Sequence, residues 1–238
     1  MVDEHQRLQN PPLLEAVFEV RADIAASLTV LPGKLAAALE TDYPDVKETD
    51  FAKFVLMAPP PPEAGFVATH QFRTSDGKGM VQLAPAGFSV NSLAYPGFQA
   101  FRSAVAKVLA SYGRHASVSA VRRLGLRYVN GLPLPGGELL SGLTASVKWP
   151  ALEAARLTSV AARGIFAYSQ PKGHLAVVIG APQETRTTLD LDFYHEPRAA
   201  MAERDILSWI DEAHQRIYEA FRSMADPKVF ESWRRGHE

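Results

Sequence analysis

Residues 72–79 read FRTSDGKG and residues 166–173 read FAYSQPKG, so the pattern Phe-x-x-Ser-x-x-Lys-Gly occurs twice in the chain. A phosphate-binding Walker loop needs Gly-x-x-x-x-Gly-Lys-Ser/Thr between a strand and a helix, and neither copy has this spacing. The dipeptide Asp76-Gly77 is common in hairpin turns, and Gly79 and Gly173 can supply the positive φ of a bulge after such a turn. The two copies therefore predict matching hairpin turns.

The segments around the two turns follow the same order in both halves of the chain. A strand, a short helix, three strands and a long helix are indicated, because alternating apolar residues give way to apolar residues three and four apart. The opening strands are expected over 13–24 and 117–132, and the short helices over 34–43 and 137–146. The long helices carry two apolar stripes, which are Phe98, Phe101, Val105, Val108, Leu109 and Tyr112, and Ile206, Trp209, Ile210, Ala213, Ile217 and Phe221.

This order predicts an α+β protein of two tandem β-α-β-β-β-α repeats, with a mostly antiparallel sheet and two long packing helices. The first half covers 1–116 and the second covers 117–238. The second half ends in a further short helix, with Asp226 in the N-cap place and Pro227 at the first helical position. Each half has too small a core to be stable alone, so we expect the halves to pack as one globular unit about a pseudo-twofold axis.

Composition narrows the range of partners and compartments. Lys and Arg number 25 against 26 Asp and Glu, and the net charge of −1 argues against a nucleic acid or an anionic membrane as the partner. The absence of cysteine excludes disulfides, thiolate zinc sites and cysteine nucleophiles. The first twenty residues carry charges where a signal peptide is apolar, and no apolar run reaches the roughly 20 residues that span a bilayer. We therefore expect a cytoplasmic protein.

Charged residues alternate with apolar ones on three of the predicted strands. In RRLGLRYVN, residues 122–130, Arg123 and Arg127 share one strand face, with Leu and Tyr on the other. If the opening strands of the two halves lie in the middle of one sheet, these arginines meet carboxylates from other strands. The residues that would share this surface are Arg123, Arg127, Glu15, Glu19, Asp190 and Asp192. The surface is then either an ion-pair network or a groove that binds an anionic or polar ligand.

A metal site is the second interpretation of the same surface. Asp190 and Asp192 point the same way on a strand, and His195 follows just past its end. Magnesium and manganese accept such oxygen-rich ligand sets. No Gly-x-Ser-x-Gly elbow and no nucleophilic triad accompanies these residues in the sequence. A metal-dependent hydrolase or phosphotransfer enzyme is therefore the alternative.

Five segments carry a resemblance to known sequences. They are NPPLLEAVFEVR at 10–21, the Tyr-x-x-Phe-x-x-Phe pattern at 95–101, LGLRYVN at 124–130, LDLD at 189–192, and the stretch 217–230. Together they resemble a sporadically distributed bacterial family, whose members are mostly uncharacterised open reading frames of about this length. The resemblance supports the architecture and implies no activity.

We therefore expect a non-enzymatic accessory module that binds a partner protein or a small polar or anionic ligand through the charged sheet face, without a cofactor. The expected binding residues are Arg123, Arg127, Asp190, Asp192 and Glu19. The oligomeric state is left open, and a homodimer is among the options.

Overall fold

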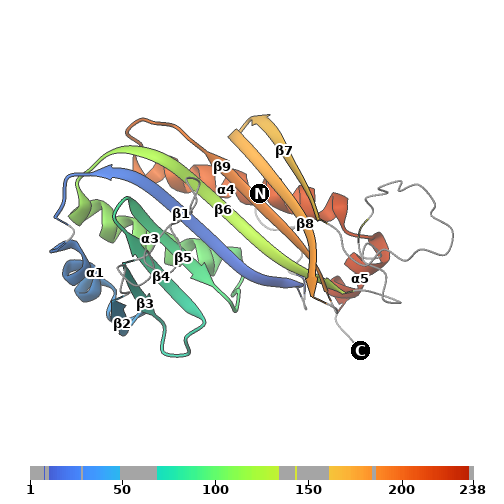
Figure 1. Ribbon diagram of the computed structural model, residues 1–238, viewed down its shortest axis with the longest axis horizontal. Helices are drawn as coiled ribbons and strands as arrows, with labels where there is room; N and C mark the ends of the chain where they lie inside the picture. Colours follow the sequence, from blue (N-terminus) through green and yellow to red (C-terminus); the bar gives the residue numbers. More distant parts are fainter. Residues whose placement is uncertain are drawn as a thin grey trace. The chain divides into compact units, whose positions relative to one another are not determined.

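The strands of the described residues form one nine-stranded sheet, in the order β2-β3-β4-β5-β1-β6-β9-β8-β7 (Figure 1). The computed structural model describes residues 8, 11–27, 29–48, 69–133, 143, 161–183 and 186–235. Its strands are β1 (Leu13–Ile24), β2 (Asp45–Glu48), β3 (His70–Arg73), β4 (Gly79–Ala84), β5 (Gly87–Ser92), β6 (Val118–Pro133), β7 (Ala161–Ser169), β8 (Lys172–Gln183) and β9 (Arg186–His195). Its helices are α1 (Leu31–Leu39), α3 (Phe98–Ala116), α4 (Glu203–Met224) and α5 (Pro227–Arg235).

The mixed fold with a largely antiparallel sheet confirms the predicted class, and the sheet is larger than predicted. The added strand is β2, whose four residues are all exposed, so it has no buried alternating face for a sequence pattern to reveal. The opening strands β1 and β6 are neighbours in the sheet order, as expected. The duplication of one ancestral unit stays a prediction. The predicted short helix over 137–146 lies outside the described residues, apart from Leu143.

The chain divides into two compact units that each take residues from both sequence halves. Unit 1 contains Met1–Leu14, Arg127–Phe193 and Glu212–Glu238, and unit 2 contains Glu15–Leu126 and Tyr194–Asp211. Each is described by itself below. None of the described helices is both long and apolar enough to cross a membrane.

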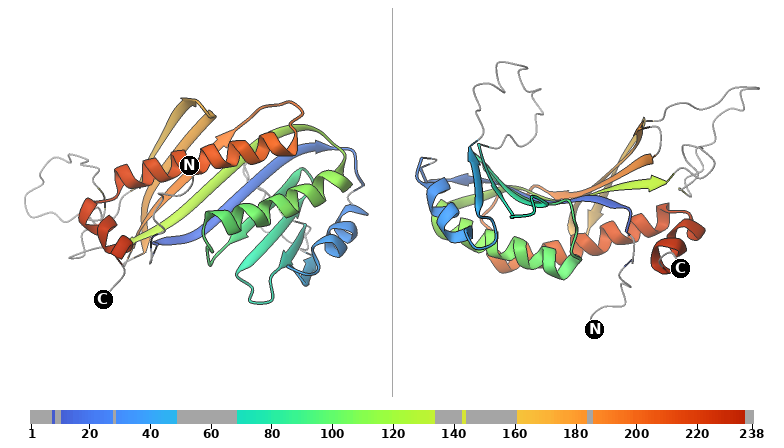
Figure 2. Two further views of the ribbon diagram at one scale, coloured as in Figure 1. Left: turned by 180° about the vertical axis from the view of Figure 1, so that it is seen from behind. Right: turned by 90° about the horizontal axis from the view of Figure 1, so that it is seen from below.

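In unit 2, α1 and α3 cover one face of strands β2 to β5 (Figure 2). The buried side of these strands and of the neighbouring β1 carries Phe88, Phe18 and other apolar side chains. The ring centroid of Phe88 lies 4.8 Å from the ring centroid of Tyr112 on α3. Five of the six residues in the predicted stripe of α3 are buried, because they face this core. The opposite face of these strands, which α1 and α3 do not cover, is called the outer face here.

In unit 1, the C-terminal part of the chain is held by aromatic packing. The ring of Phe221 on α4 packs against two rings of α5. It stacks on Trp233, with 5.6 Å between ring centroids, and its centroid lies 6.2 Å from that of Phe230. Asp226 caps α5, because its Oδ1 accepts hydrogen bonds from the backbone N–H groups of Lys228 (2.9 Å) and Val229 (3.3 Å). The predicted Asp-Pro start of this helix is confirmed. The apolar stripe predicted for α4, whose residues are divided between the two units, is buried throughout.

Both copies of the repeated octapeptide form hairpin turns, as predicted. The first joins β3 to β4 and the second joins β7 to β8. The positive φ of the first turn falls on Gly77, at 69°, and the prediction that Gly79 adopts it was wrong. Gly79 lacks a side chain for another reason, since a Cβ there would lie 2.7 Å from Cγ2 of Thr74. The turn closes through a hydrogen bond from the Gly77 N–H to the Thr74 carbonyl, at 2.9 Å.

Candidate binding site on the outer sheet face

Two of the predicted site residues form an ion pair in unit 2. Oε1 of Glu19 on β1 accepts hydrogen bonds from Nη1 of Arg123 (2.8 Å) and Nε of Arg21 (2.7 Å). The Glu19 and Arg123 side chains are only 14% and 18% exposed, so solvent screens this pair weakly. The Arg123 guanidinium also lies 5.2 Å from the centre of the Tyr194 ring, which is cation–π distance. The predicted pairing of arginine with carboxylate is therefore present here.

Two further predicted residues form a second pair, in unit 1. Arg127 on β6 donates from Nε and Nη2 to the two carboxylate oxygens of Asp190 on β9, at 2.8 and 2.7 Å. This is the bidentate geometry for which the planar guanidinium is best suited. The Arg127 side chain is 46% exposed, so this pair contributes little to stability.

The residues of the metal alternative do not assemble a ligand set. Asp190, Asp192 and His195 all belong to the described residues, and no three His, Asp or Glu side chains there form a group that could hold a metal ion. Both oxygens of Asp190 bond Arg127 instead. Asp192 is half-buried on β9, and His195 ends that strand.

Strand register places a line of polar side chains across the outer face of unit 2. Residues directly opposite one another on neighbouring strands project from the same face. The register pairs Lys47 with Gln71, Gln71 with Gln82, Gln82 with Ser89, and Ser89 with Glu19. Glu19 in turn binds Arg123. We call this set the polar row; its members are Lys47, Gln71, Gln82, Ser89, Glu19 and Arg123.

Most of the polar row is half-buried, although α1 and α3 lie on the other side of the strands. Ser89 is only 3% exposed and donates to Oδ1 of Asn91 at 2.8 Å. Asn91 then donates from Nδ2 to Oε1 of Glu15 at 2.9 Å. These contacts fix the orientation of the Asn91 amide, because its oxygen accepts and its nitrogen donates. The β5 end of the face is therefore an ordered hydrogen-bonded surface.

Two groups on the outer face keep unused hydrogen-bonding capacity. The Gln82 side chain makes one contact within the described residues, a long one of 3.7 Å from Nε2 to Sδ of Met80. Within the described part of the chain no group donates to its carbonyl oxygen, which can therefore accept. Arg73 donates from Nη2 to Gln71 at 2.6 Å, and its Nε is buried with no hydrogen-bond partner in the described part of the chain. A buried donor without a partner costs about 1–3 kcal/mol.

The sequence-based prediction did not include Gln71, Gln82, Ser89 or Asn91, because it considered only charged residues as binding residues. A signal was present: in QFR, MVQL and FSVN the polar residues alternate with buried Phe72, Val81 and Val90. That alternation shows which residues face outward. It does not show which of them lie side by side, because the register between strands comes from the turns.

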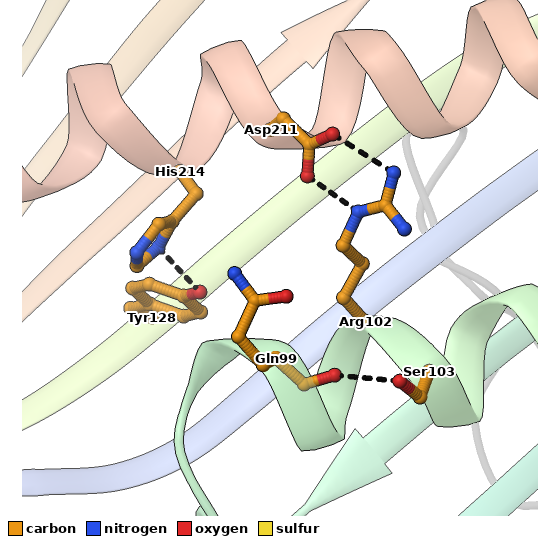
Figure 3. A network of polar contacts seen from close by, with 6 residues as sticks. All are labelled: Gln99, Arg102, Ser103, Tyr128, Asp211 and His214. Carbon is orange, nitrogen blue, oxygen red and sulfur yellow. Dashed lines mark hydrogen bonds and ion pairs between the residues drawn. The ribbon is translucent and has the colours of Figure 1, made fainter. Parts of the chain in front are cut away.

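Helix α4 contributes two further polar contacts, one to each unit (Figure 3). In unit 2, Arg102 on α3 donates to both carboxylate oxygens of Asp211, at 2.5 and 2.9 Å, and this carboxylate raises the pKa of the guanidinium. In unit 1, the Tyr128 hydroxyl lies 2.9 Å from Nδ1 of His214. The His214 side chain is half-buried, because it packs on this tyrosine of β6.

Comparison with known proteins identifies no family. No protein-family model matches the chain, and no curated protein matches it. Among solved structures, the chain is similar to one described as Methanococcus jannaschii TBP, at 11% sequence identity and a TM-score of 0.28. The match covers 87% of this chain and 96% of that one. At this TM-score the likeness establishes neither a common fold nor a common function.

Proposed function

We propose that this chain is a non-enzymatic module that binds a small polar ligand on the outer face of unit 2, with the polar row as its floor. The observation that carries the proposal is the unused capacity at Gln82 and Arg73 within the described residues, beside Ser89, Asn91 and Glu15, which are hydrogen-bonded to one another. A ligand that supplies a donor to the Gln82 oxygen and an acceptor to Arg73, whose guanidinium would have to turn to expose its Nε, removes the cost of leaving these groups unpaired.

The chemistry of the row favours a ligand with hydroxyl, amide or carboxylate groups. Glutamine and serine side chains both donate and accept, so they discriminate by the position of hydrogen bonds rather than by charge. The charges at Glu19, Arg21 and Arg123 are already paired within the chain. Arg73 forms no ion pair in the described residues, so it is the position for a single negative group on the ligand.

The same face is less suited to a partner protein. Protein interfaces are anchored by aromatic side chains and large apolar side chains that are exposed before binding. The large exposed apolar residues of the described chain are Leu14, Val30, Val46, Leu93, Ile165 and Phe166, and none of them belongs to the polar row. A small ligand is therefore the better occupant.

The test is a thermal-shift screen with sugars, nucleosides, amino acids and dicarboxylates, followed by calorimetric titration of any compound that raises Tm. We expect Gln82→Leu to weaken binding by about tenfold, the effect of one lost hydrogen bond to a buried group. The matched control is Gln99→Leu, an exposed glutamine on α3 that should leave the affinity unchanged. Mass spectrometry of the recovered compound should show it unmodified.

Three results would overturn the proposal. The first is that no compound class raises Tm. The second is that Gln82→Leu and Gln99→Leu bind equally well, which would place the ligand elsewhere. The third is conversion of the compound to a product, which would make the chain an enzyme.

A further inference from the structure

We propose that β7 pairs with β7 of a second copy of this chain, so that two sheets join edge to edge in a symmetric dimer. This inference is independent of the ligand site, because it concerns the last strand of the sheet order and involves no residue of the polar row. It starts from an edge that the described residues leave open.

Among the described strands, β7 is paired on one side only. Its nine residues all pair with β8 in an unbroken antiparallel register, from Ala161 opposite Gly180 to Ser169 opposite Lys172. No other described strand lies along its outer edge, since β7 ends the sheet order. A strand in that position presents a row of unpaired backbone N–H and C=O groups, which is a template for another strand.

This edge lacks the devices that usually prevent strand addition. Edge strands are protected by shortness, charges, proline or bulges. β7 is AARGIFAYS, which has one charge, no proline and no break in its register with β8. The strand at the other end of the sheet order, β2, is DVKE: it has four residues, and three of them are charged. Of the two terminal strands, β2 therefore carries such protection in its own sequence and β7 does not.

Both faces of β7 expose large apolar side chains. Ile165 is 50% exposed and Phe166 is 54% exposed, and consecutive residues of a strand point to opposite faces. A single covering helix would bury only one of the two. Extension of the sheet by another strand covers part of both, because the new strand carries side chains on each face.

The sequence of β7 is complementary to itself in one register. Ile165 is the midpoint of the strand, so an antiparallel pair centred on two Ile165 residues uses all nine residues of each copy. Gly164 then lies opposite Phe166 of the second copy, and Arg163 lies opposite Ala167 of the second copy. Within one chain the Phe166 ring already lies over Gly164, with Cε2 3.2 Å from the position of a Cβ there, so the two Ile165 side chains form the apolar centre of the pair. The two arginines are separated along the strands, so like charges do not oppose each other.

A twofold axis through the two Ile165 residues relates the two β7 strands of this antiparallel pair, and the pairing requires no contact outside β7. Closed dimers with the same patch on both copies are the commonest form of protein assembly. Antiparallel pairing of one strand with its own copy satisfies that symmetry, because residue i opposes j and j opposes i. The second copy is thus the occupant that fits the composition and the length of this edge.

The experiment is analytical ultracentrifugation of the full chain at micromolar concentrations. We expect the wild type to be dimeric, and Ile165→Lys and Ile165→Glu each to raise the dissociation constant by at least about tenfold, because like charges would face each other at the centre of the pair. A mixture of the two variants should restore a dimer of one lysine and one glutamate chain. Leu93→Lys is the control, since Leu93 is 59% exposed and lies outside β7.

A wild type that is monomeric, or single variants that remain as dimeric as the wild type, would overturn the proposal. Dimers that dissociate in both Ile165 variants but fail to re-form in the mixture would overturn the register centred on Ile165. Circular dichroism of each variant shows whether it is folded. Hydrogen exchange of the β7 amides gives a second readout, because it should slow with increasing wild-type concentration.

Discussion

The guanidinium of Arg123 lies against the α-carbon of Gly125, two residues along β6, so that a Cβ at Gly125 would lie 2.3 Å from Nη1 of Arg123. Glycine normally weakens a strand interior. Here its missing side chain gives the arginine room to lie along the sheet, and the same Nη1 donates to Glu19 on the neighbouring strand. The glycine of LGLRYVN therefore has a packing role tied to one ion pair.

Gly125→Ala should displace the Arg123 guanidinium and break its hydrogen bond to Glu19. We expect the free energy of unfolding, measured with urea, to fall by about 1 kcal/mol, the usual contribution of a hydrogen bond in a partly buried site. The control is Gly125→Ala in an Arg123→Ala background. No guanidinium then lies next to residue 125, so the substitution should lower the free energy of unfolding only slightly. Equal losses in both backgrounds would show that the glycine is needed for another reason, such as backbone conformation.

The long helices and the α5 cap were predictable because their signals are local. Apolar residues three and four apart define a buried helix face wherever that face packs, and Asp226-Pro227 specifies a helix start from two adjacent residues. β2 was missed because an exposed edge strand has no buried face. The prediction that Gly79 takes the positive φ failed because the turn closes between Thr74 and Gly77. Which of the two glycines adopts the positive φ depends on the number of residues in the loop.

The candidate site was predicted only in part. Alternation along β6, β1 and β9 was enough to place Arg123, Arg127, Glu19 and Asp190 among the outward residues that form the two ion pairs. The polar row depends on strand register across β2, β3, β4 and β5, which alternation alone does not fix. The contact of His214 with Tyr128 joins segments far apart in the chain, so no local pattern indicates it.

Tyr112→Phe should leave the stability unchanged or raise it by up to about 1 kcal/mol. The Tyr112 side chain is 1% exposed, and its hydroxyl has no hydrogen-bond partner in the described part of the chain. Removing a buried unpaired hydroxyl removes a desolvation cost. Urea unfolding at neutral pH measures the change. Tyr128→Phe is the comparison and should cost about 1 kcal/mol, because that hydroxyl bonds His214. A large loss in Tyr112→Phe would mean that its hydroxyl does have a partner.

Stability should fall at alkaline pH through two tyrosines. Burial raises the pKa of Tyr43 and of Tyr112 from 10.0 to about 12. Between these values the unfolded chain loses the phenol protons and the folded chain keeps them, so the free energy of unfolding decreases as pH rises. Urea titrations from neutral pH to about pH 11 should show a shallower decline in a Tyr43→Phe, Tyr112→Phe double variant than in the wild type. Parallel declines would contradict this assignment.

Asp226→Ala should lower the free energy of unfolding by about 1 kcal/mol, the usual cost of losing an N-cap side chain. The carboxylate accepts from two backbone N–H groups in the first turn of α5, and nothing in an alanine side chain can replace it. Asp226→Asn keeps an acceptor oxygen at the same place and should retain most of the stability. Because Phe230 and Trp233 of α5 pack on Phe221, loss of the cap should also increase the solvent exposure of Trp233 in the native state. Tryptophan quenching by acrylamide measures that exposure. If asparagine and alanine destabilise the chain equally, the carboxylate acts through its charge and not as a cap.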